Sequence, residues 1–256
     1  MGSVNWNVVF GPEGRALFAS GLWITVQLAF YAIVFSSLIG SLIAFGRVSK
    51  SPALRPLRTA LTALVEFIRN VPVLVQLAFW YFGVFGLQSV QWLVSPLSGI
   101  YSIEFIAGAC ALIVYRSAYI AEAVRSGLQS VPRGQYEAAM ATGLGYTTTM
   151  VRIIMPQAYR MALPTLINHY VGVTKNTSIV LVIGVPDLVF QAYTLTSRTF
   201  EVFLVMGTAV AIFVVLCTLI STGFNMLGSY LDRRWGYARP SHGPRSLKTW
   251  LKELAA

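Results

Sequence analysis

Long apolar runs dominate the chain. Ala19–Phe45 and Phe203–Tyr230 contain no charged side chain at all. Both runs exceed the roughly 20 residues that an α-helix needs to cross the hydrocarbon core of a bilayer. Three further stretches are nearly as apolar, and breaks that contain proline, glycine and serine separate them. The pattern predicts an all-α integral membrane protein with about five transmembrane helices, at 19–45, 60–88, 103–126, 158–183 and 201–230.

Basic residues gather in alternate breaks between these runs. One set of breaks and the C-terminal end hold Arg47, Lys50, Arg55, Arg58, Arg133, Arg152, Arg233, Arg234, Arg239, Arg245, Lys248 and Lys252. The remaining breaks hold chiefly Arg15 and Arg198. An excess of Lys and Arg marks cytoplasmic loops. We therefore predict a multi-pass membrane protein with its N-terminus outside and its C-terminus in the cytoplasm.

Composition supports this topology. Of 256 residues, 56% are hydrophobic and only 11% are charged, so the chain cannot cover a soluble domain with solvated side chains. A net charge of +10 suits nucleic-acid binding in principle, but here the basic residues follow the membrane topology, and we predict no nucleic-acid partner. Cys110 and Cys217 lie in separate apolar runs and are interpreted as small buried hydrophobic residues.

The chain divides into one transmembrane domain with two flanking segments. We predict an N-terminal extracytoplasmic segment at 1–18, a transmembrane domain at 19–232 with a central insert at 130–157, and a cytoplasmic tail at 233–256. Transporters usually place their site between two repeats, and this chain shows no long internal repeat. A second subunit, identical or different, is therefore expected to supply the other half.

Several charged residues fall inside the predicted spans, where each costs a few kcal/mol. Glu66 and Arg69 are three residues apart, as are Glu122 and Arg125, so each pair shares a helix face and can neutralise itself. Arg116 has no such partner, and neither has Lys175. Two interpretations stay open for these residues: structural ion pairs near helix ends, or the lining of a polar pathway.

Pro72 interrupts the second span within the sequence FIRNVP, directly after Arg69. A proline inside a helix removes a hydrogen bond and bends the helix. Broken helices often form small polar sites in membranes, although one proline is weak evidence by itself.

The sequence offers little support for enzyme chemistry. It contains no GxxxxGK[ST], HExxH or GxSxG motif, and its two histidines, His169 and His242, lie far apart. The chain itself is therefore predicted to be non-catalytic and to bind no cofactor. A membrane-embedded enzyme would need titratable groups near the insert, where Glu137 is the only acid. A stand-alone channel or secondary transporter remains the other alternative.

The central insert predicts short helices outside the membrane. Pro132 and Gly134 open a turn, 135–142 favours a helix, and Gly143 can end that helix. Thr147 is placed to cap a second short helix that ends towards Pro156. The alanines of the first helix, Ala138, Ala139 and Ala141, would allow another protein to approach closely. Taken alone, the same pattern also suits a helix lying in the membrane interface.

The residues of the insert carry a family resemblance. The insert resembles the EAA coupling motif of bacterial ABC importer permeases. The matching residues are Glu137, Ala138 and Ala139, with Gly143, Ile154 and Pro156 at fixed offsets, and Met155 stands in place of the usual leucine. Four further segments resemble the polar amino acid branch of that family: 68–76 (IRNVPVLVQ), 118–135 (AYIAEAVRSGLQSVPRGQ), 163–180 (LPTLINHYVGVTKNTSIV) and 183–189 (IGVPDLV).

The resemblance implies a type I, MetI-like permease fold and a multi-subunit importer in the bacterial cytoplasmic (inner) membrane. Its expected partners are a second permease (homo- or heterodimer), two ABC ATPase subunits that carry ATP and Mg²⁺, an extracytoplasmic substrate-binding protein and an amino acid substrate. The residues expected to couple this chain to the ATPases are Gly134, Glu137, Ala138, Ala139, Gly143, Ile154 and Pro156. Glu137 is expected either to contact a basic residue of the ATPase, to cap its own helix or to be solvated.

The resemblance also bears on the substrate. Relatives that carry cationic amino acids tend to have a Glu and an Asp where this chain has His169 and Asn176. Without those carboxylates a cationic substrate would be unpaired, so we expect glutamate, aspartate or a broad range of polar L-amino acids. The candidate substrate pathway is Arg69, Pro72, Arg116, Glu122, His169, Lys175, Asn176, Thr177 and Ser178. In a heteromeric importer, the partner permease can hold the substrate instead.

Overall fold

The computed structural model describes residues 5–48 and 52–234, and every statement below concerns these residues. Within them the chain is helical, with turns and short loops and no strand. It divides into a large unit, Met1–Ser221, and a second unit, Thr222–Ala256, in which the last helix continues to Arg234. The end of the predicted tail, from residue 235 on, lies outside the described residues.

Five apolar elements can cross a membrane. Three single helices are long and apolar enough to span it: α2 (Pro12–Val48), α6 (Ile103–Ser130) and the Val202–Leu231 part of α11 (Val202–Arg234). Two further spans result if each bent pair of helical segments counts as one. One pair is η1 and α3 (Pro52–Asn70) with α4 and η2 (Val73–Val84), and the other is Tyr146–Ile183 with α10 (Leu188–Thr199). This arrangement confirms the predicted number of about five spans. It also shows that two of those spans are broken.

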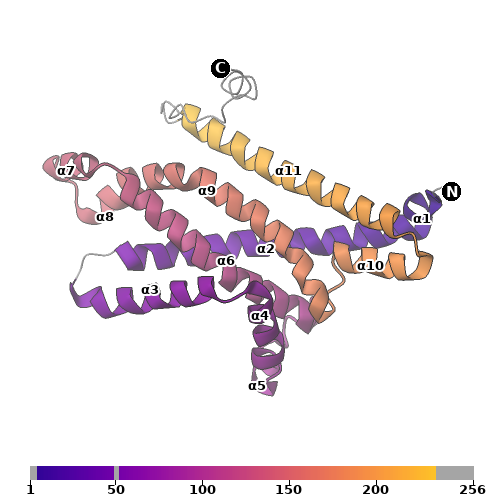
Figure 1. The fold of residues 1–256 in the computed structure, drawn as a ribbon. Helices are drawn as coiled ribbons and strands as arrows, with labels where there is room; N and C mark the ends of the chain where they lie inside the picture. Colours follow the sequence, from indigo (N-terminus) through magenta and orange to yellow (C-terminus); the bar gives the residue numbers. More distant parts are fainter. Residues whose placement is uncertain (1–4, 49–51, 235–256) are drawn as a thin grey trace, which may run out of the picture. The chain divides into compact units, whose positions relative to one another are not determined.

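Helix α6 packs along α2 on one side and α9 (Met155–Asn176) on another (Figure 1). Small residues allow this close packing. A Cβ atom on Gly40 of α2 would lie 2.8 Å from the Ser117 carbonyl oxygen of α6, and one on Gly127 of α6 would lie 2.4 Å from the Ala158 carbonyl oxygen of α9. Lipid tails are as apolar as leucine side chains, so the hydrophobic effect does not drive helices together inside a membrane. Helices there associate mainly through close packing at small residues.

The first long helix, α2, begins before the apolar run that predicted it. Pro12 starts α2, since a proline at the first helical position loses no hydrogen bond, and Glu13 follows in the first turn. The predicted boundary after residue 18 therefore falls inside α2. The preceding short helix α1 (Asn7–Phe10) and α10 contribute to one buried cluster with Val9, Phe18 and Leu188.

The break between the predicted spans 158–183 and 201–230 is largely helical. Thr177–Ile183 forms a 3₁₀ helix, η4, which ends at Gly184 with a φ of 84°. Asp187 then caps α10 by accepting a hydrogen bond from the Phe190 amide at 2.9 Å. The Leu188 amide donates to Thr25 Oγ1 of α2 at 3.0 Å, so this side chain satisfies a buried backbone donor at the bend. Gly184, Pro186 and Asp187 lie in a loop, as their residue types indicate, but α10 directly after them was not predicted.

Pro72 breaks the second span completely. Helix α3 (Arg55–Asn70) ends at Val71, which is extended, and α4 (Val73–Ala78) starts directly after Pro72 at an angle of 105° to it. The π-helical turn η2 (Phe79–Val84) and helix α5 (Gln88–Val94) follow (Figure 1). Gln76 Nε2 donates to two backbone carbonyls at the break, Ile68 at 2.7 Å and Val71 at 3.0 Å. This buried amide replaces the hydrogen bonds that the broken helix loses.

We expect Gln76→Leu to destabilise the break, because two carbonyls lose their donor while side-chain volume is kept. An unsatisfied buried polar group costs about 1–3 kcal/mol. The measurement is the thermal unfolding temperature of the purified permease in detergent. Gln88→Leu, on the exposed surface of α5, is the matched control, and an equal effect of the two substitutions would contradict this role of Gln76.

Candidate functional site

The central insert begins with a short helix that has a well-defined end. Helix α7 runs from Arg133 to Ala141, and Gly143 follows it with a φ of 81°. The Gly143 amide donates to the Met140 carbonyl at 3.0 Å, and the Leu144 amide donates to the Ala139 carbonyl at 3.4 Å. These two bonds form a Schellman motif, which needs the left-handed backbone that glycine adopts without strain. The predicted helix end at Gly143 is confirmed.

The expected second short helix is not a separate element. Tyr146–Thr149 (α8) and the π-helical turn Met150–Ile154 (η3) lead directly into α9. Pro156 has no amide hydrogen to donate, so an α-helix cannot pass through it regularly, and the wider turn comes just before it. Gly145 occupies the N-cap position and no side chain caps α8, so the prediction that Thr147 is the cap is wrong.

The insert has an inner and an outer face. Ala139 and Ile154 are buried, with exposed fractions of 5% and 6%. Helix α7 packs against η3, and Gln157 Nε2 of α9 donates to Gln135 Oε1 of α7 at 3.4 Å. Gly134 and Ala138 lie exposed on α7. Only part of the predicted coupling set therefore lies on the surface, and Ala139 packs within the chain rather than facing outward.

Glu137 also lies on the outer face of α7. It is the fifth residue of this helix, whose N-cap position is Pro132, so the expectation that it caps its own helix is wrong. Within the described part of the chain, Glu137 forms no hydrogen bond or ion pair. Its carboxylate is accessible to solvent or to another protein.

The two predicted ion pairs are present in the membrane region. Arg69 Nη1 lies 3.6 Å from Glu66 Oε1, and Arg125 binds Glu122 through both its Nε and Nη2 atoms. Sequence analysis missed a third member: Arg47 Nη1 of α2 lies 2.9 Å from Glu122 Oε2. Helix spacing cannot reveal this partner, because Arg47 comes from another helix. Glu122, predicted as a pathway residue, is thus held between two guanidinium groups, Arg47 and Arg125.

Arg116 is buried, with an exposed fraction of 7%. Its guanidinium lies over the rings of Tyr115 and Tyr119, with its carbon 5.5 and 5.6 Å from their centroids. Within the described chain it forms no hydrogen bond or ion pair, and its Nε atom is buried without a partner. Gly172 leaves room for it, since a Cβ there would lie 3.3 Å from both terminal nitrogens. A buried cation that only aromatic rings accompany is unusual at membrane depth.

Tyr119 connects Arg116 to two other predicted residues. The Arg69 guanidinium carbon lies 5.5 Å from its ring centroid, and the His169 ring lies at 5.8 Å. Its hydroxyl donates to the Arg69 carbonyl at 3.3 Å and accepts from Tyr115 at 3.2 Å. Three predicted pathway residues thus meet around one tyrosine that sequence analysis missed. The available signal was the position of Tyr119 between Arg116 and Glu122 on one helix.

A hollow of about 270 Å³ opens beside this cluster. Its lining residues are Arg69, Tyr119, Glu122, Ala123, Ser126, Gly127, Ser130, Met161, Ala162, Thr165 and His169. We refer to it as the histidine hollow. The predicted residues Arg69, Glu122 and His169 all line it, so the structure brings these side chains together.

The other predicted pathway residues lie away from the histidine hollow. Lys175 and Asn176 end α9, two turns beyond His169. Thr177 is buried and donates to the Thr174 carbonyl at 2.8 Å, while Ser178 donates to the Lys175 carbonyl at 2.8 Å. Pro72 forms the break between α3 and α4. None of these five residues lines either hollow, and neither does Arg116.

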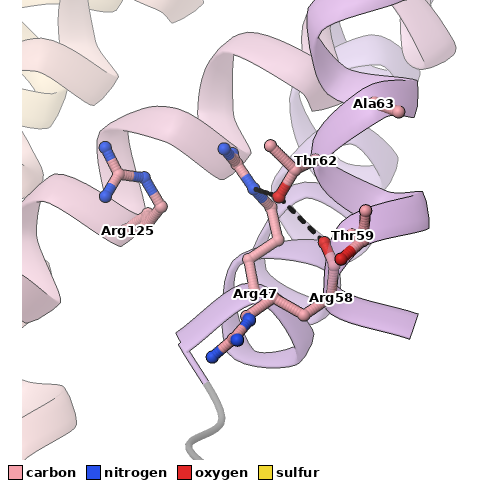
Figure 2. A pocket seen from close by; sticks show the side chains of 6 residues that line it. All are labelled: Arg47, Arg58, Thr59, Thr62, Ala63 and Arg125. Carbon is pink, nitrogen blue, oxygen red and sulfur yellow. Dashed lines mark hydrogen bonds between the residues drawn. The ribbon is translucent and has the colours of Figure 1, made fainter. Parts of the chain in front are cut away.

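A second hollow, of about 460 Å³, lies among α2, α3 and α6 (Figure 2). Arginine and threonine dominate its lining, which consists of Arg47, Arg58, Thr59, Thr62, Ala63 and Arg125. Arg47 Nε donates to Thr62 Oγ1 at 3.3 Å, and Thr62 Oγ1 donates to the Arg58 carbonyl at 2.8 Å. We refer to it as the arginine hollow.

Residues 36–237 match the family of binding-protein-dependent transport system inner membrane components. The chain belongs to this family. It is 34% identical to the probable glutamine ABC transporter permease protein GlnM of Bacillus subtilis (strain 168), over 91% of this chain and 100% of that protein. A crystal structure of an amino acid ABC transporter with histidines superposes with a TM-score of 0.72 at 33% identity, covering 91% of this chain and 100% of that one.

The fold is shared more widely. An inward-facing structure of the MetNI methionine ABC transporter gives a TM-score of 0.69 at 20% identity, over 84% of this chain and 96% of that one. This likeness confirms the predicted type I, MetI-like fold. Family membership makes the chain a permease of an ABC importer in the inner membrane, and confirms that it is a non-catalytic subunit whose partner ATPase hydrolyses ATP.

We expect Glu122→Gln to weaken the contact between α2 and α6, because Arg47 would lose its carboxylate partner. Exposed ion pairs contribute up to about 1 kcal/mol, and breaking a buried pair costs about 3–5 kcal/mol. Since the Glu122 side chain is 28% exposed, an intermediate loss of stability is expected. Thermal unfolding of the purified permease measures it. Glu66→Gln, which removes the longer pair with Arg69 and leaves Glu122 in place, is the control, and a larger effect there would contradict this role of Glu122.

Proposed function

We propose that this chain is a transmembrane subunit of an ATP-driven importer for acidic or broad-range polar L-amino acids. It would form the translocation path with a second permease, identical or different, and receive substrate from an extracytoplasmic binding protein. Two separate ATPase subunits would hold ATP and Mg²⁺. The observation that carries the proposal is the family match over residues 36–237, which includes the whole insert. The amino acid transport named for the similar proteins supports the substrate class.

The insert is proposed as the contact with one ATPase. Its outer face presents Gly134, Glu137 and Ala138, which form an exposed surface of small residues with one unpaired acid. A carboxylate of this kind suits a basic residue in a groove of the partner. The alternating basic loops support a cytoplasmic position for the insert, with the N-terminus outside.

The insert is also built to transmit force. The Schellman motif ends α7 sharply, the buried residues Ala139 and Ile154 lie on its inner face, and η3 runs without a loop into α9. Movement of the ATPases would therefore reach the membrane helices instead of being lost in a flexible linker. In the proposed cycle, ATP-driven closure of the ATPase pair draws the two inserts together and opens the permeases outward. Hydrolysis returns them to the inward-facing state.

The coupling role predicts that Gly143→Glu abolishes amino acid uptake and substrate-stimulated ATP hydrolysis while the permease still inserts. A side chain at a positive φ costs about 1–2 kcal/mol and disturbs the helix end that positions Glu137. The assay uses liposomes that contain the complete importer, with ATP inside and binding protein outside. Gly145→Glu is the control, because Gly145 has an ordinary φ of −65° and open space around it.

Intact coupling in Gly143→Glu would contradict the docking assignment. The same liposomes test the function as a whole. Uptake must depend on ATP and on the ATPase subunits. Uptake that an ion gradient drives without them would show a secondary transporter instead.

The charge of the membrane cluster supports an anionic or neutral substrate. Arg116 and Arg69 lie around Tyr119, next to His169, and the nearby carboxylate of Glu122 is already bound by two arginines. An amino acid carboxylate would find an uncompensated guanidinium here, whereas a cationic side chain would meet repulsion. Asn176 lies two turns beyond His169 on α9 and adds an uncharged polar group to the proposed substrate pathway. We propose that the pathway continues along Lys175, Thr177 and Ser178.

We expect His169→Glu combined with Asn176→Asp to shift uptake towards lysine and arginine, since the new carboxylates would neutralise the guanidiniums and attract cations. Competition of each amino acid against labelled glutamine or glutamate measures the shift. His169→Gln combined with Asn176→Ser is the uncharged control. An unchanged profile would show that the partner permease, not this chain, holds the substrate.

A further inference from the structure

Tyr119 lies between the histidine hollow and the buried cation Arg116. The half-buried Tyr119 side chain lines the hollow, whereas Arg116 does not. The Arg116 guanidinium carbon lies 5.6 Å from the Tyr119 ring centroid, a distance typical of a cation–π contact. Arg116 is 7% exposed, and its Nε atom is buried without a hydrogen-bond partner. One tyrosine ring thus covers a guanidinium that would otherwise border the hollow.

The helix itself places the ring over Arg116. Tyr119 follows three residues later on α6, and helical side chains lean back over the preceding turn. On another side Arg116 meets α9, because a Cβ on Gly172 would lie 3.3 Å from both terminal nitrogens. Tyr115 provides a second ring, with its centroid 5.5 Å from the guanidinium carbon. Of these three neighbours, only Tyr119 lines the hollow, so a ligand in the hollow meets this ring first.

The hydroxyl of Tyr119 occupies the C-terminal end of α3. It donates to the Arg69 carbonyl at 3.3 Å and accepts from the Tyr115 hydroxyl at 3.2 Å. Helix α3 ends at Asn70, so a further turn of helix does not supply the Arg69 carbonyl with a donor. The C-terminal end of a helix also carries partial negative charge. The hydroxyl therefore fills a position that suits a cationic donor.

Both hydrogen bonds that hold Tyr119 are long. Hydrogen bonds between a hydroxyl and an oxygen usually measure about 2.5–3.0 Å, and these measure 3.3 and 3.2 Å. At the same end of α3, Gln76 donates to the Ile68 carbonyl at 2.7 Å. Gln76 thus holds the helix break closely, whereas Tyr119 borders open space in the hollow and can leave its position at a smaller cost.

We propose that Tyr119 occupies the position of a substrate's α-ammonium and α-carboxylate groups and is displaced when an amino acid binds. In the displaced state, the carboxylate pairs with Arg116, and the ammonium group donates to the Arg69 carbonyl in place of the hydroxyl. A single tyrosine side chain contacts both positions, so one small zwitterion can replace it. The inference rests on the proposed import of amino acids and names the residue that selects for them.

Displacement makes Tyr119 a specificity-determining residue. A ligand shifts the equilibrium between covered and uncovered Arg116 only through contacts that the uncovered state provides. An amino acid replaces both contacts of the tyrosine. A simple carboxylate leaves the Arg69 carbonyl without a donor, and a simple amine leaves the buried guanidinium without an anion, which costs free energy in either case. The site thus favours amino acids over ligands that carry only one of the two groups.

Phenylglyoxal, which modifies arginine side chains that it can reach, tests whether Tyr119 covers Arg116. The complete importer is treated in nanodiscs, and mass spectrometry of peptides gives the modification rates of Arg116 and Arg69 in the same sample. Arg69 lines the hollow with a side chain that is 34% exposed, so it reports access to the hollow itself. A minor state is populated in about 10% of molecules or fewer, so Tyr119→Ala should raise the Arg116 to Arg69 ratio about tenfold or more.

Tyr115→Ala is the matched control. It removes a ring at nearly the same distance from Arg116, but one outside the hollow lining, and should leave the ratio close to that of the parent. Tyr119→Leu, which keeps much of the apolar volume, should give a smaller rise and replaces the alanine variant if that variant does not fold. An equal rise in the Tyr115 and Tyr119 variants, or no rise in the Tyr119 variants, would overturn the proposal.

Ligands distinguish displacement by substrate from a purely structural cap at α3. L-Glutamate should slow modification of Arg116 in the parent and in Tyr119→Ala. Glutarate, which lacks the ammonium group, and L-glutamate dimethyl ester, which lacks free carboxylates, should slow it much less at equal concentration. Equal protection by glutarate would overturn the proposal, because the site would then have no ammonium position.

ATP-dependent uptake of labelled L-glutamate by the same parent preparation tests the import function separately. Uptake without any protection of Arg116 would contradict displacement of Tyr119 by substrate. Absence of uptake would contradict the proposed function instead, while the modification rates without ligand still measure whether Tyr119 covers Arg116.

Discussion

A bilayer interior supplies no hydrogen-bond partners, so backbone groups freed where a helix breaks there need partners within the protein. This protein breaks two of its five spans. At the first break, Gln76 donates to the Ile68 and Val71 carbonyls. At the second, Thr25 of α2 accepts from the Leu188 amide, and Asp187 accepts from the Phe190 amide. These few side chains satisfy backbone groups that the breaks would otherwise leave without partners.

The same constraint governs charge. Glu122 is satisfied by Arg47 and Arg125, which join α2 to α6. Arg116 has aromatic faces instead of an acid, and Gly172 provides the space that it occupies. A guanidinium left without an anion in a membrane region is a binding opportunity for a substrate carboxylate. The ion pairs of Glu122 and the proposed ligand group Arg116 thus lie on the same helix, α6.

The insert has an exposed side and a buried side. Its exposed small residues and Glu137 lie on α7, while its buried side connects through η3 to α9. Because Ala139 lies on the inner side, one residue of the EAA sequence serves the fold of the insert and its neighbours serve the surface. Successive residues of a helix point in different directions, so this short motif provides both a buried contact and an exposed surface.

Sequence alone was sufficient for the number of spans, the fold class, the helix end at Gly143 and the pairs Glu66–Arg69 and Glu122–Arg125. All of these depend on local pattern: apolar length, glycine at a positive φ, and side chains three residues apart. It could not reveal the completeness of the break at Pro72, helix α10, the burial of Ala139 or the continuity of α8 with α9. It also could not place Arg47 beside Glu122 or Tyr119 between Arg69, Arg116 and His169. Those contacts join residues from different helices, and only packing decides which helix faces meet.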